Sequence, residues 1–322
     1  MNIQVYRFTG NHYEVGVQQG KAMRESIHDG IEAILASELI KSSKPKLVPI
    51  SLYYSMAKRR ADHMLRNDIF KYQPKQAQRM QGIADGAEVD LQTILFTQML
   101  EVLIGCTTVA VSQDRTSTSE TIMAKNFDYV SFLVPYNLAR STDKAEIFVP
   151  LGIILQEMLE TCVTVDEGVG MIMQSKRGGH DGLITLTDSS GAIKTVELSS
   201  HFAVIREAVN GQAINTNNYQ TVEMQKHEVP LDSGSMPGYR TSPERVDRAM
   251  ELLKGTPLVD EAALRAVLCD HGKEGIPSIH TICKHGEPAC THRSMIFFPR
   301  RKTIKVLFGN PCQGEYQEIG FT

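Results

Sequence analysis

The sequence predicts an α+β protein in which helices form the first third and antiparallel strands with covering helices form the rest. In the first hundred residues, apolar side chains such as Met23, Ile27 and Ile31 recur at helical spacing. The periodicity changes at Gly105, and short strand-like runs separated by turn residues follow. These observations favour sheets with helices packed on their outer faces.

In the first third, residues 2–8 are expected to form a strand, and a helix carries the apolar positions from 23 to 35. The polar stretch 41–46 ends that pattern. Further helices are expected over 49–72, over 75–86 and after Asp90, whose side chain suits an N-cap.

After Gly105 the sequence alternates between strands and helices. The expected elements, in order, are a hairpin of 107–113 and 121–127, a helical region over 150–175, a meander of hairpins over 181–217, a loop over 219–242, helices near 243–254 and 259–269, and a closing hairpin around 299–302. The last turn of the meander is Asn210-Gly211, a strong short-turn dipeptide.

Length, composition and charge bound the class of protein. A chain of 322 residues suffices for one large or two medium domains, and 42% hydrophobic with 22% charged residues is ordinary globular composition. A net charge of -3 argues against a nucleic-acid partner. Six cysteines are too few for a disulfide framework and indicate a reducing, cytoplasmic environment. No apolar segment reaches the length of a membrane span, so no membrane partner is expected.

Residues of types that act in catalysis are expected near Cys106, where the helical region ends and the first strong strand begins. If the two strands that follow pair as a hairpin, Asn126-Phe127-Asp128 returns beside Cys106. The meander ends in the polar residues 215–218, whose amides could donate to an oxyanion. A cysteine at a strand start is also commonly a small buried apolar residue, and Asp128 and Asn217 also suit turns. Spacing alone therefore leaves a structural role open.

Gly105-Cys106-Thr107-Thr108, followed by Asn126-Phe127-Asp128, resembles the acyl-coenzyme A:isopenicillin N acyltransferase family, the C45-type branch of the N-terminal nucleophile (Ntn) hydrolases. Thr216-Asn217-Asn218 resembles the family's Thr-Asn-His triplet. The other matching segments are FTGNHYEVGVQQGKAMRESI (8–27), MQGIADGAEVDLQTILFTQMLEVL (80–103), PSIHTICKH (277–285) and KVLFGNPC (305–312). The resemblance implies an Ntn-hydrolase-like four-layer αββα sandwich with a helical N-terminal segment.

The resemblance also implies that the chain is a precursor. The Cys106 thiol would attack the carbonyl of Gly105, and hydrolysis of the resulting thioester would separate residues 1–105, a small helical subunit, from 106–322, the catalytic subunit. The two fragments would stay associated within one αββα domain, and a homo-oligomer is compatible with this. The released α-amine titrates near neutral pH and can serve as base for the thiol of its own residue.

The site residues that the resemblance implies have distinct roles. Cys106 is the nucleophile, Asp128 orients its amine, Asn217 donates to the oxyanion, Gly105 and Thr108 take part in self-cleavage, and Asn126, Phe127 and Asn218 line the substrate site. Phe127 stands where the family more commonly has Trp. No metal or organic cofactor is implied, and the partners are small molecules: an acyl donor, which includes acyl-coenzyme A, and an acceptor.

The sequence departs from the family after Asp128. Residues 129–149 hold at most two strands, where the family continues with several. Three explanations stay open: the site is trimmed, another segment replaces the strands, or the chain neither folds nor cleaves normally. A second departure is that Arg293-Ser294 lies out of register with the family's Ser-Arg pair.

Three functions remain open within this resemblance. An acyltransferase passes the acyl group to an amine, whereas a hydrolase of linear amides, of the penicillin V, bile-salt or N-acyl-amine type, passes it to water. The third is a non-catalytic relative that keeps the framework after losing core strands.

Two other motifs favour structural roles. The segment His280–His292 is rich in zinc-ligand residue types, but its spacing fits no paired-cysteine pattern, and alternation along a strand would scatter the ligands. A strand and loop without metal are therefore expected there. Ser55-Met56-Ala57-Lys58 matches Ser-x-x-Lys but lacks the accompanying motifs of penicillin-binding enzymes.

Overall fold

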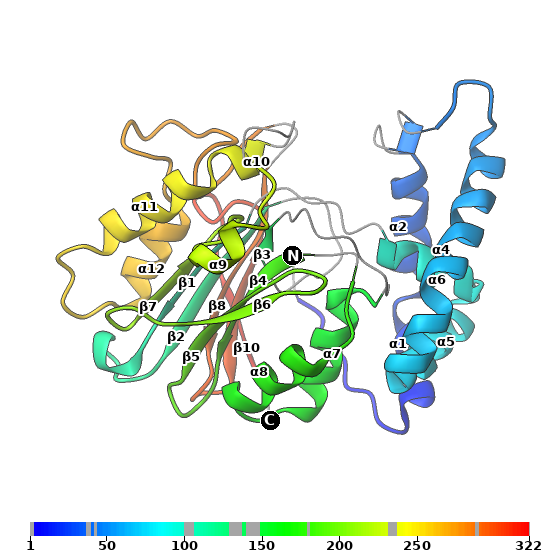
Figure 1. Cartoon of the computed structure of the whole chain (residues 1–322), viewed down its shortest axis with the longest axis horizontal. Coiled ribbons are helices and arrows are strands. Elements are labelled where there is room, and N and C mark those ends of the chain that lie inside the picture. Colours follow the sequence, from blue (N-terminus) through cyan, green and yellow to red (C-terminus); the bar gives the residue numbers. More distant parts are fainter. Residues whose placement is uncertain are drawn as a thin grey trace. The chain divides into compact units, whose positions relative to one another are not determined.

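The structure is a computed structural model that describes residues 3–36, 40–41, 44–99, 106–128, 137–139, 149–178, 181–230, 237–286 and 290–321. The chain divides into two compact units (Figure 1). The first is Met1–Glu101 with Ile147–Glu157, and the second is Val102–Glu146 with Met158–Thr322. The helix α7 (Leu151–Thr161) begins in the first unit and ends in the second.

The first unit is helical, as its apolar periodicity predicts. Its other helices are α1 (His12–Ala22), α2 (Arg24–Ala36), α4 (Ile50–Tyr72), α5 (Pro74–Ala87) and α6 (Leu91–Met99). The predicted N-cap is confirmed, because Asp90 Oδ1 accepts a hydrogen bond of 2.7 Å from the amide of Thr93. The expected strand over 2–8 is wrong for residues 3–8, which have no regular secondary structure.

Helices α1 and α5 pack at close range through four glycines. Gly16 and Gly20 on α1 face Gly82 and Gly86 on α5, and a Cβ atom at any of the four would collide with a backbone carbonyl of the other helix. The Gly-x-x-x-Gly spacing of both segments therefore serves helix packing, since only glycine lets the two backbones approach this closely.

The described residues of the second unit form two antiparallel sheets. The first sheet has the order β10-β9-β8-β2-β1-β7 and the second has the order β3-β4-β5-β6. The strands are β1 (Cys106–Val111), β2 (Ile122–Asp128), β3 (Asn137–Ala139), β4 (Asp181–Thr187), β5 (Ile193–Leu198), β6 (Ala203–Glu207), β7 (Gln212–Asn215), β8 (Thr291–Phe298), β9 (Thr303–Phe308) and β10 (Gln317–Gly320).

Helices cover the outer face of each sheet (Figure 1). On the first sheet, α11 (Ser242–Leu253) and α12 (Glu261–Leu268) bury apolar side chains against β1, β2 and β8. On the second sheet, α8 (Val165–Gln174) packs against β4 and β5. Between the sheets, Ala110 and Ala213 of the first sheet meet Ile193 of the second. The predicted four-layer αββα sandwich is therefore confirmed, and all four layers belong to the second unit.

The prediction that the meander ends in a hairpin is wrong, although the turn of that hairpin forms. Asn210 and Gly211 both have positive φ, and Val209 pairs with Gln212 in an antiparallel bridge. The two strands then separate, because β6 pairs with β5 in the second sheet and β7 pairs with β1 in the first. A local turn signal thus marks the place where the chain passes from one sheet to the other.

Short elements complete the second unit. The expected loop over 219–242 contains two short helices, α9 (Val222–Gln225) and α10 (Pro237–Arg240), and η1 (Gln113–Arg115) is a 3-10 turn between β1 and β2. The short segment after Asp128 contributes the edge strand β3, and the rest of 129–148 lies outside the described residues.

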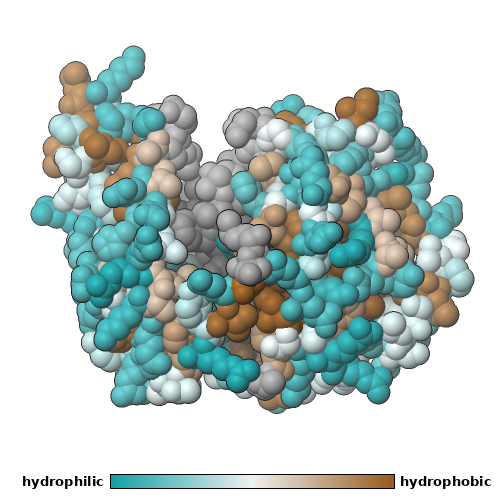
Figure 2. Space-filling model, turned by 180° about the vertical axis from the view of Figure 1, so that it is seen from behind, coloured by the Kyte–Doolittle hydropathy of each residue, from teal (hydrophilic) through white to brown (hydrophobic). Residues whose placement is uncertain are grey.

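The surface drawn in Figure 2 mixes hydrophilic and hydrophobic side chains. None of the helices in the described part of the chain is long and apolar enough to cross a membrane.

Candidate active site

Cys106 is the first residue of β1, and the register of the hairpin determines its neighbours. Cys106 pairs with Phe127, and Thr108 pairs with Lys125. Because side chains alternate along a strand, Cys106 and Thr108 share the face of Ala110, which lies between the two sheets. The predicted return of β2 beside the cysteine is therefore what the structure shows.

Two side chains hold the backbone of Cys106. Its amide donates to Asn217 Oδ1 at 2.8 Å. Arg245, in the first turn of α11, donates to the Cys106 carbonyl at 2.8 Å, to Thr107 Oγ1 at 3.0 Å and to Asn217 Oδ1 at 2.9 Å. Because the Asn217 oxygen accepts both bonds, its Nδ2 is the end that can donate. These contacts fix the direction in which the chain enters β1.

Asp128 is buried beside the cysteine. Its Oδ1 accepts a hydrogen bond of 2.7 Å from Thr291, and its Oδ2 lies 4.0 Å from Lys284 Nζ. Oδ2 has no hydrogen-bond partner within the described part of the chain. Burial raises the pKa of Asp128 to about 6, although the charges of Lys284 and Arg245 act in the opposite direction. A buried carboxylate oxygen without a partner is a place where a cation would be stabilised.

Lys125 brings a buried amine to the face of the cysteine. It lies two residues before Phe127 on β2, and its Nζ is 4.9 Å from the centre of the Phe127 ring. Burial lowers the pKa of Lys125 to about 8, while Cys106 and Asp128 favour its charged form. Its ammonium form is thus favoured about ten-fold at pH 7.

Burial raises the pKa of the Cys106 thiol, whereas Lys125 and Arg245 lower it. The backbone amide of Asp128 also favours the thiolate, while the carboxylate of Asp128 disfavours it. Burial is the largest effect, so the thiol is protonated at neutral pH in the continuous chain. A nucleophilic role therefore requires a base close to the sulfur.

The remaining predicted site residues divide between the two faces of the strands. Thr108 is buried two residues beyond Cys106 on the same face. Phe127 is half-buried opposite Cys106, where it can line the site. Gly105 lies outside the described residues.

Asn126 differs from its expected position. It lies on the opposite face of β2, where its amide donates to the carbonyls of Leu268 at 2.8 Å and Ile282 at 3.1 Å. Its oxygen accepts a bond of 2.7 Å from Ser294. The expected substrate contact is corrected to a structural role, since alternation turns this side chain toward the helices when Phe127 faces the other sheet.

Asn218 is also engaged by protein groups. Its oxygen accepts a bond of 2.6 Å from Ser242, the first residue of α11, and its nitrogen donates to the Tyr219 carbonyl at 3.1 Å. The hydroxyl of Ser242 in turn accepts from the backbone amide of Asn217 at 2.6 Å. These bonds make Asn218 part of the network that positions Asn217, and its expected contact with a substrate stays a prediction.

Lys125, Arg245 and Lys284 are not among the site residues that the sequence predicts. The alternation of the expected strand 121–127 could have revealed Lys125, since it places that residue on the face of Phe127. Arg245 and Lys284 carry no local signal, because a helix and a loop far along the chain bring them to Cys106 and Asp128.

No model of a known protein family matches the chain, and no curated protein matches it. Among solved structures it is similar to a Caenorhabditis elegans N-acylethanolamine-hydrolyzing acid amidase ortholog, with 14% identity, a TM-score of 0.38, and coverage of 61% of this chain and 93% of that chain. It is also similar to a mutant of the conjugated bile acid hydrolase from Clostridium perfringens, with 9% identity and a TM-score of 0.34. The match covers 69% of this chain and 90% of that chain. A second variant of that hydrolase has a TM-score of 0.30 at the same identity and coverage.

Proposed function

We propose that this chain is a self-cleaving cysteine enzyme of the Ntn type that forms an acyl-enzyme on Cys106. The observation that carries the proposal is the placement of this thiol at the start of β1, with Asn217 on its backbone nitrogen and Asp128 beside it. The substrates are linear amides or acyl thioesters, and the acyl group passes to water or to an amine. No part of this reaction calls for an organic cofactor.

Self-cleavage changes the chemistry of the site. The sulfur attacks the carbonyl carbon of the preceding residue, the C–N bond to Cys106 breaks, and the nitrogen takes up a proton as the thioester forms. Water then hydrolyses the thioester and leaves the thiol and a free α-amine on the same residue. This supplies the base that the protonated thiol lacks, since an α-amine titrates near pH 7.7–8.0.

The surroundings of the Cys106 nitrogen suit such an amine. Asn217 Oδ1 already accepts a bond from this nitrogen, and the Oδ2 atom of Asp128 is an unpartnered buried acceptor among the described residues. In the uncleaved chain the bond goes to Asn217. We assign the stabilisation of the ammonium form to Asp128 and the donation to an oxyanion to Asn217 Nδ2.

The test is the intact mass of the purified protein beside its Cys106→Ala variant. Cleavage before Cys106 splits 35.8 kDa into fragments of about 12 and 24 kDa, in proportion to 105 and 217 residues. We expect both fragments from the wild type and from Cys162→Ala, a control for a thiol elsewhere in the second unit, and an intact chain from Cys106→Ala. A wild type that stays whole after long incubation contradicts self-cleavage.

A second measurement separates an enzyme from a non-catalytic relative. The cleaved protein is mixed with an acyl-coenzyme A, an N-acylethanolamine or a conjugated bile acid, and the mass of the Cys106 peptide is followed. An added acyl group on Cys106 supports catalysis, and release to water or to an added amine distinguishes hydrolase from transferase. Absence of any adduct with all three donors favours the non-catalytic alternative.

A further inference from the structure

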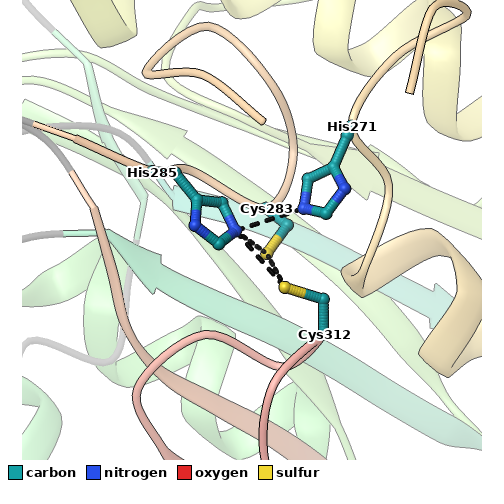
Figure 3. Close-up of side chains that lie close together, drawn as sticks. All are labelled: His271, Cys283, His285 and Cys312. Atoms are coloured by element: carbon teal, nitrogen blue, oxygen red, sulfur yellow. Dashed lines mark hydrogen bonds between the residues drawn. The ribbon is translucent and has the colours of Figure 1, made fainter. Parts of the chain in front are cut away.

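Four side chains with metal-ligand chemistry converge in the second unit (Figure 3). They are His271, Cys283, His285 and Cys312, and their ligand atoms all lie within 4.8 Å of one another. His271 follows α12, Cys283 and His285 belong to the segment before β8, and Cys312 lies between β9 and β10. Segments far apart in the sequence thus bring two thiols and two imidazoles together.

Four of the six distances between the ligand atoms match a tetrahedral site, and the two from His271 to the sulfurs lie within 4.8 Å. Zn–S bonds of about 2.3 Å and Zn–N bonds of about 2.0–2.1 Å at tetrahedral angles separate two sulfurs by about 3.8 Å, sulfur and nitrogen by about 3.5 Å, and two nitrogens by about 3.3 Å. The two sulfurs lie 3.7 Å apart. His285 Nε2 lies 3.4 Å from Cys283 Sγ, 3.3 Å from Cys312 Sγ and 3.2 Å from His271 Nε2.

The chain around Cys283 is organised for this arrangement. Cys283 and His285 turn toward the cluster, while the alternate residues contact β2: the Ile282 carbonyl accepts from Asn126, and Lys284 lies beside Asp128. Asn310 Nδ2 lies 3.7 Å from Cys283 Sγ and donates to the Lys284 carbonyl at 2.6 Å. An N–H group directed at a cysteine sulfur is typical of the partners that orient metal thiolates.

We propose that these four residues form a structural Zn²⁺ site. Two thiolates and two imidazoles in tetrahedral arrangement select zinc among the common divalent ions. Four protein ligands leave no coordination position for a substrate, so the metal holds the loops together and does not take part in acyl transfer. Cys283 is fully buried and Cys312 is exposed, which places the site at the edge of the protein with an entry side for the ion.

The proposal extends beyond the function proposed for Cys106, and its test needs no acyl substrate. The full chain is produced in zinc-containing medium and purified without chelator, and its metals are measured by mass spectrometry. We expect about one zinc per chain. Less than about 0.2 zinc per chain, with no uptake when the reduced protein receives one equivalent of Zn²⁺, overturns the proposal. A disulfide between Cys283 and Cys312 in freshly purified protein, detected by the mass and thiol content of the peptides, also overturns it.

Variants identify the ligands. We expect His271→Ala and Cys312→Ala to lose most of the bound zinc, and Cys290→Ala and His292→Ala to retain it. The latter two are matched controls, since they have the same residue types in the same region and contact each other at 3.2 Å outside the cluster. Full zinc content in both His271→Ala and Cys312→Ala contradicts the proposed ligand set.

Replacement of zinc by Co²⁺ in the wild type gives a readout that does not depend on the folding of a variant. Visible bands of tetrahedral cobalt with thiolate charge transfer are expected. An octahedral spectrum would contradict the proposal.

Discussion

The Cys106 site and the His271–Cys312 cluster lie in the same unit but are built in different ways. Cys106, Lys125 and Phe127 come from two adjacent strands, and the backbone pairing of the hairpin places them. The four residues of the cluster come from loops, and among the described residues these are joined by single backbone bonds, such as that from the Cys283 amide to the Asp270 carbonyl at 3.0 Å. A strand register positions side chains without any ligand, whereas a set of loops gains much of its order from what it binds.

Thr291 and Lys284 connect the two regions. The Thr291 hydroxyl donates to Asp128 and accepts from the Lys284 amide at 2.9 Å. Lys284 lies in the sequence between the two ligands Cys283 and His285. The carboxylate of the candidate active site is therefore held by the segment that the proposed metal would order.

The largest effect is expected from Arg245→Met. This change removes the buried donor to the Cys106 carbonyl and to Thr107 Oγ1, and one of the two donors to Asn217 Oδ1. Loss of a buried charge partner costs about 3–5 kcal/mol of the free energy of unfolding. Urea unfolding measures the loss, and we expect self-cleavage to slow at least about 100-fold. Arg240→Met is the control because its side chain is exposed, and it should stay within about 0.5 kcal/mol of the wild type. Equal stabilities of the two variants would refute the structural role of Arg245.

Asp128→Asn tests the Cys106 site through the pH dependence of the free energy of unfolding. The pKa of Asp128 is raised to about 6 in the folded chain, above its ordinary 3.8. Its contribution to stability is thus complete below about pH 4 and is lost as the pH rises through about 6. Relative to the Asp128→Asn variant, the free energy of unfolding of the wild type should fall by about 1–3 kcal/mol between about pH 4 and about pH 6.

Denaturant unfolding at pH 4, 5, 6 and 7 measures this difference. Asp166→Asn is the control, since its carboxylate is 79% exposed, and its curve should follow that of the wild type. Parallel curves for the wild type and Asp128→Asn would show that burial does not govern this carboxyl group.

Lys125→Met addresses the reactivity of the thiol. The charge of Lys125 lowers the pKa of Cys106, so its removal should shift the midpoint of Cys106 alkylation upward by about one pH unit. Iodoacetamide labelling followed by peptide mass analysis reads this residue alone among the six cysteines. Lys176→Met, which changes an exposed lysine, should leave the midpoint unchanged. An unchanged midpoint in Lys125→Met would show that the charge of this lysine does not act on the thiol of Cys106.

The smallest effect is expected from Thr291→Val, which cuts the connection between the two regions. Loss of a buried hydrogen bond to Asp128 should cost about 1–1.5 kcal/mol and slow self-cleavage several-fold, while the zinc content stays the same. Thr303→Val is a matched control, since the Thr303 hydroxyl is buried without a partner among the described residues. A simultaneous loss of zinc in Thr291→Val would show that the two regions form one cooperative unit.

The sequence was informative where neighbours in space are also neighbours in a hairpin. The pairing of 107–113 with 121–127 placed Phe127 and Asp128 beside Cys106, because a short antiparallel connection leaves little freedom of register. It was misleading at Asn210-Gly211, where the turn forms but β6 and β7 join different sheets. Turn chemistry determines the backbone of two residues, whereas the sheet that each strand joins depends on distant partners.

The candidate metal ligands show the same limit. The segment 280–292 is rich in histidines and cysteines, but its spacing favours no metal. Cys283 and His285 do share a face, as residues two apart on an extended chain should. The other two members, His271 and Cys312, lie outside that segment, so no spacing rule within it could reveal the set.

The sequence by itself determined the helical first third, the α+β class, the strands of the hairpins and the position of Cys106 at a strand start. These features follow from periodicity and turn residues, which act over a few residues. Only the tertiary structure decided which side chains surround the thiol and the Asp128 carboxylate, and that Asn126 faces the helices. Arg245 and Lys284 reach these groups across more than 130 residues of chain, and such contacts depend on the packing of layers that no local pattern encodes.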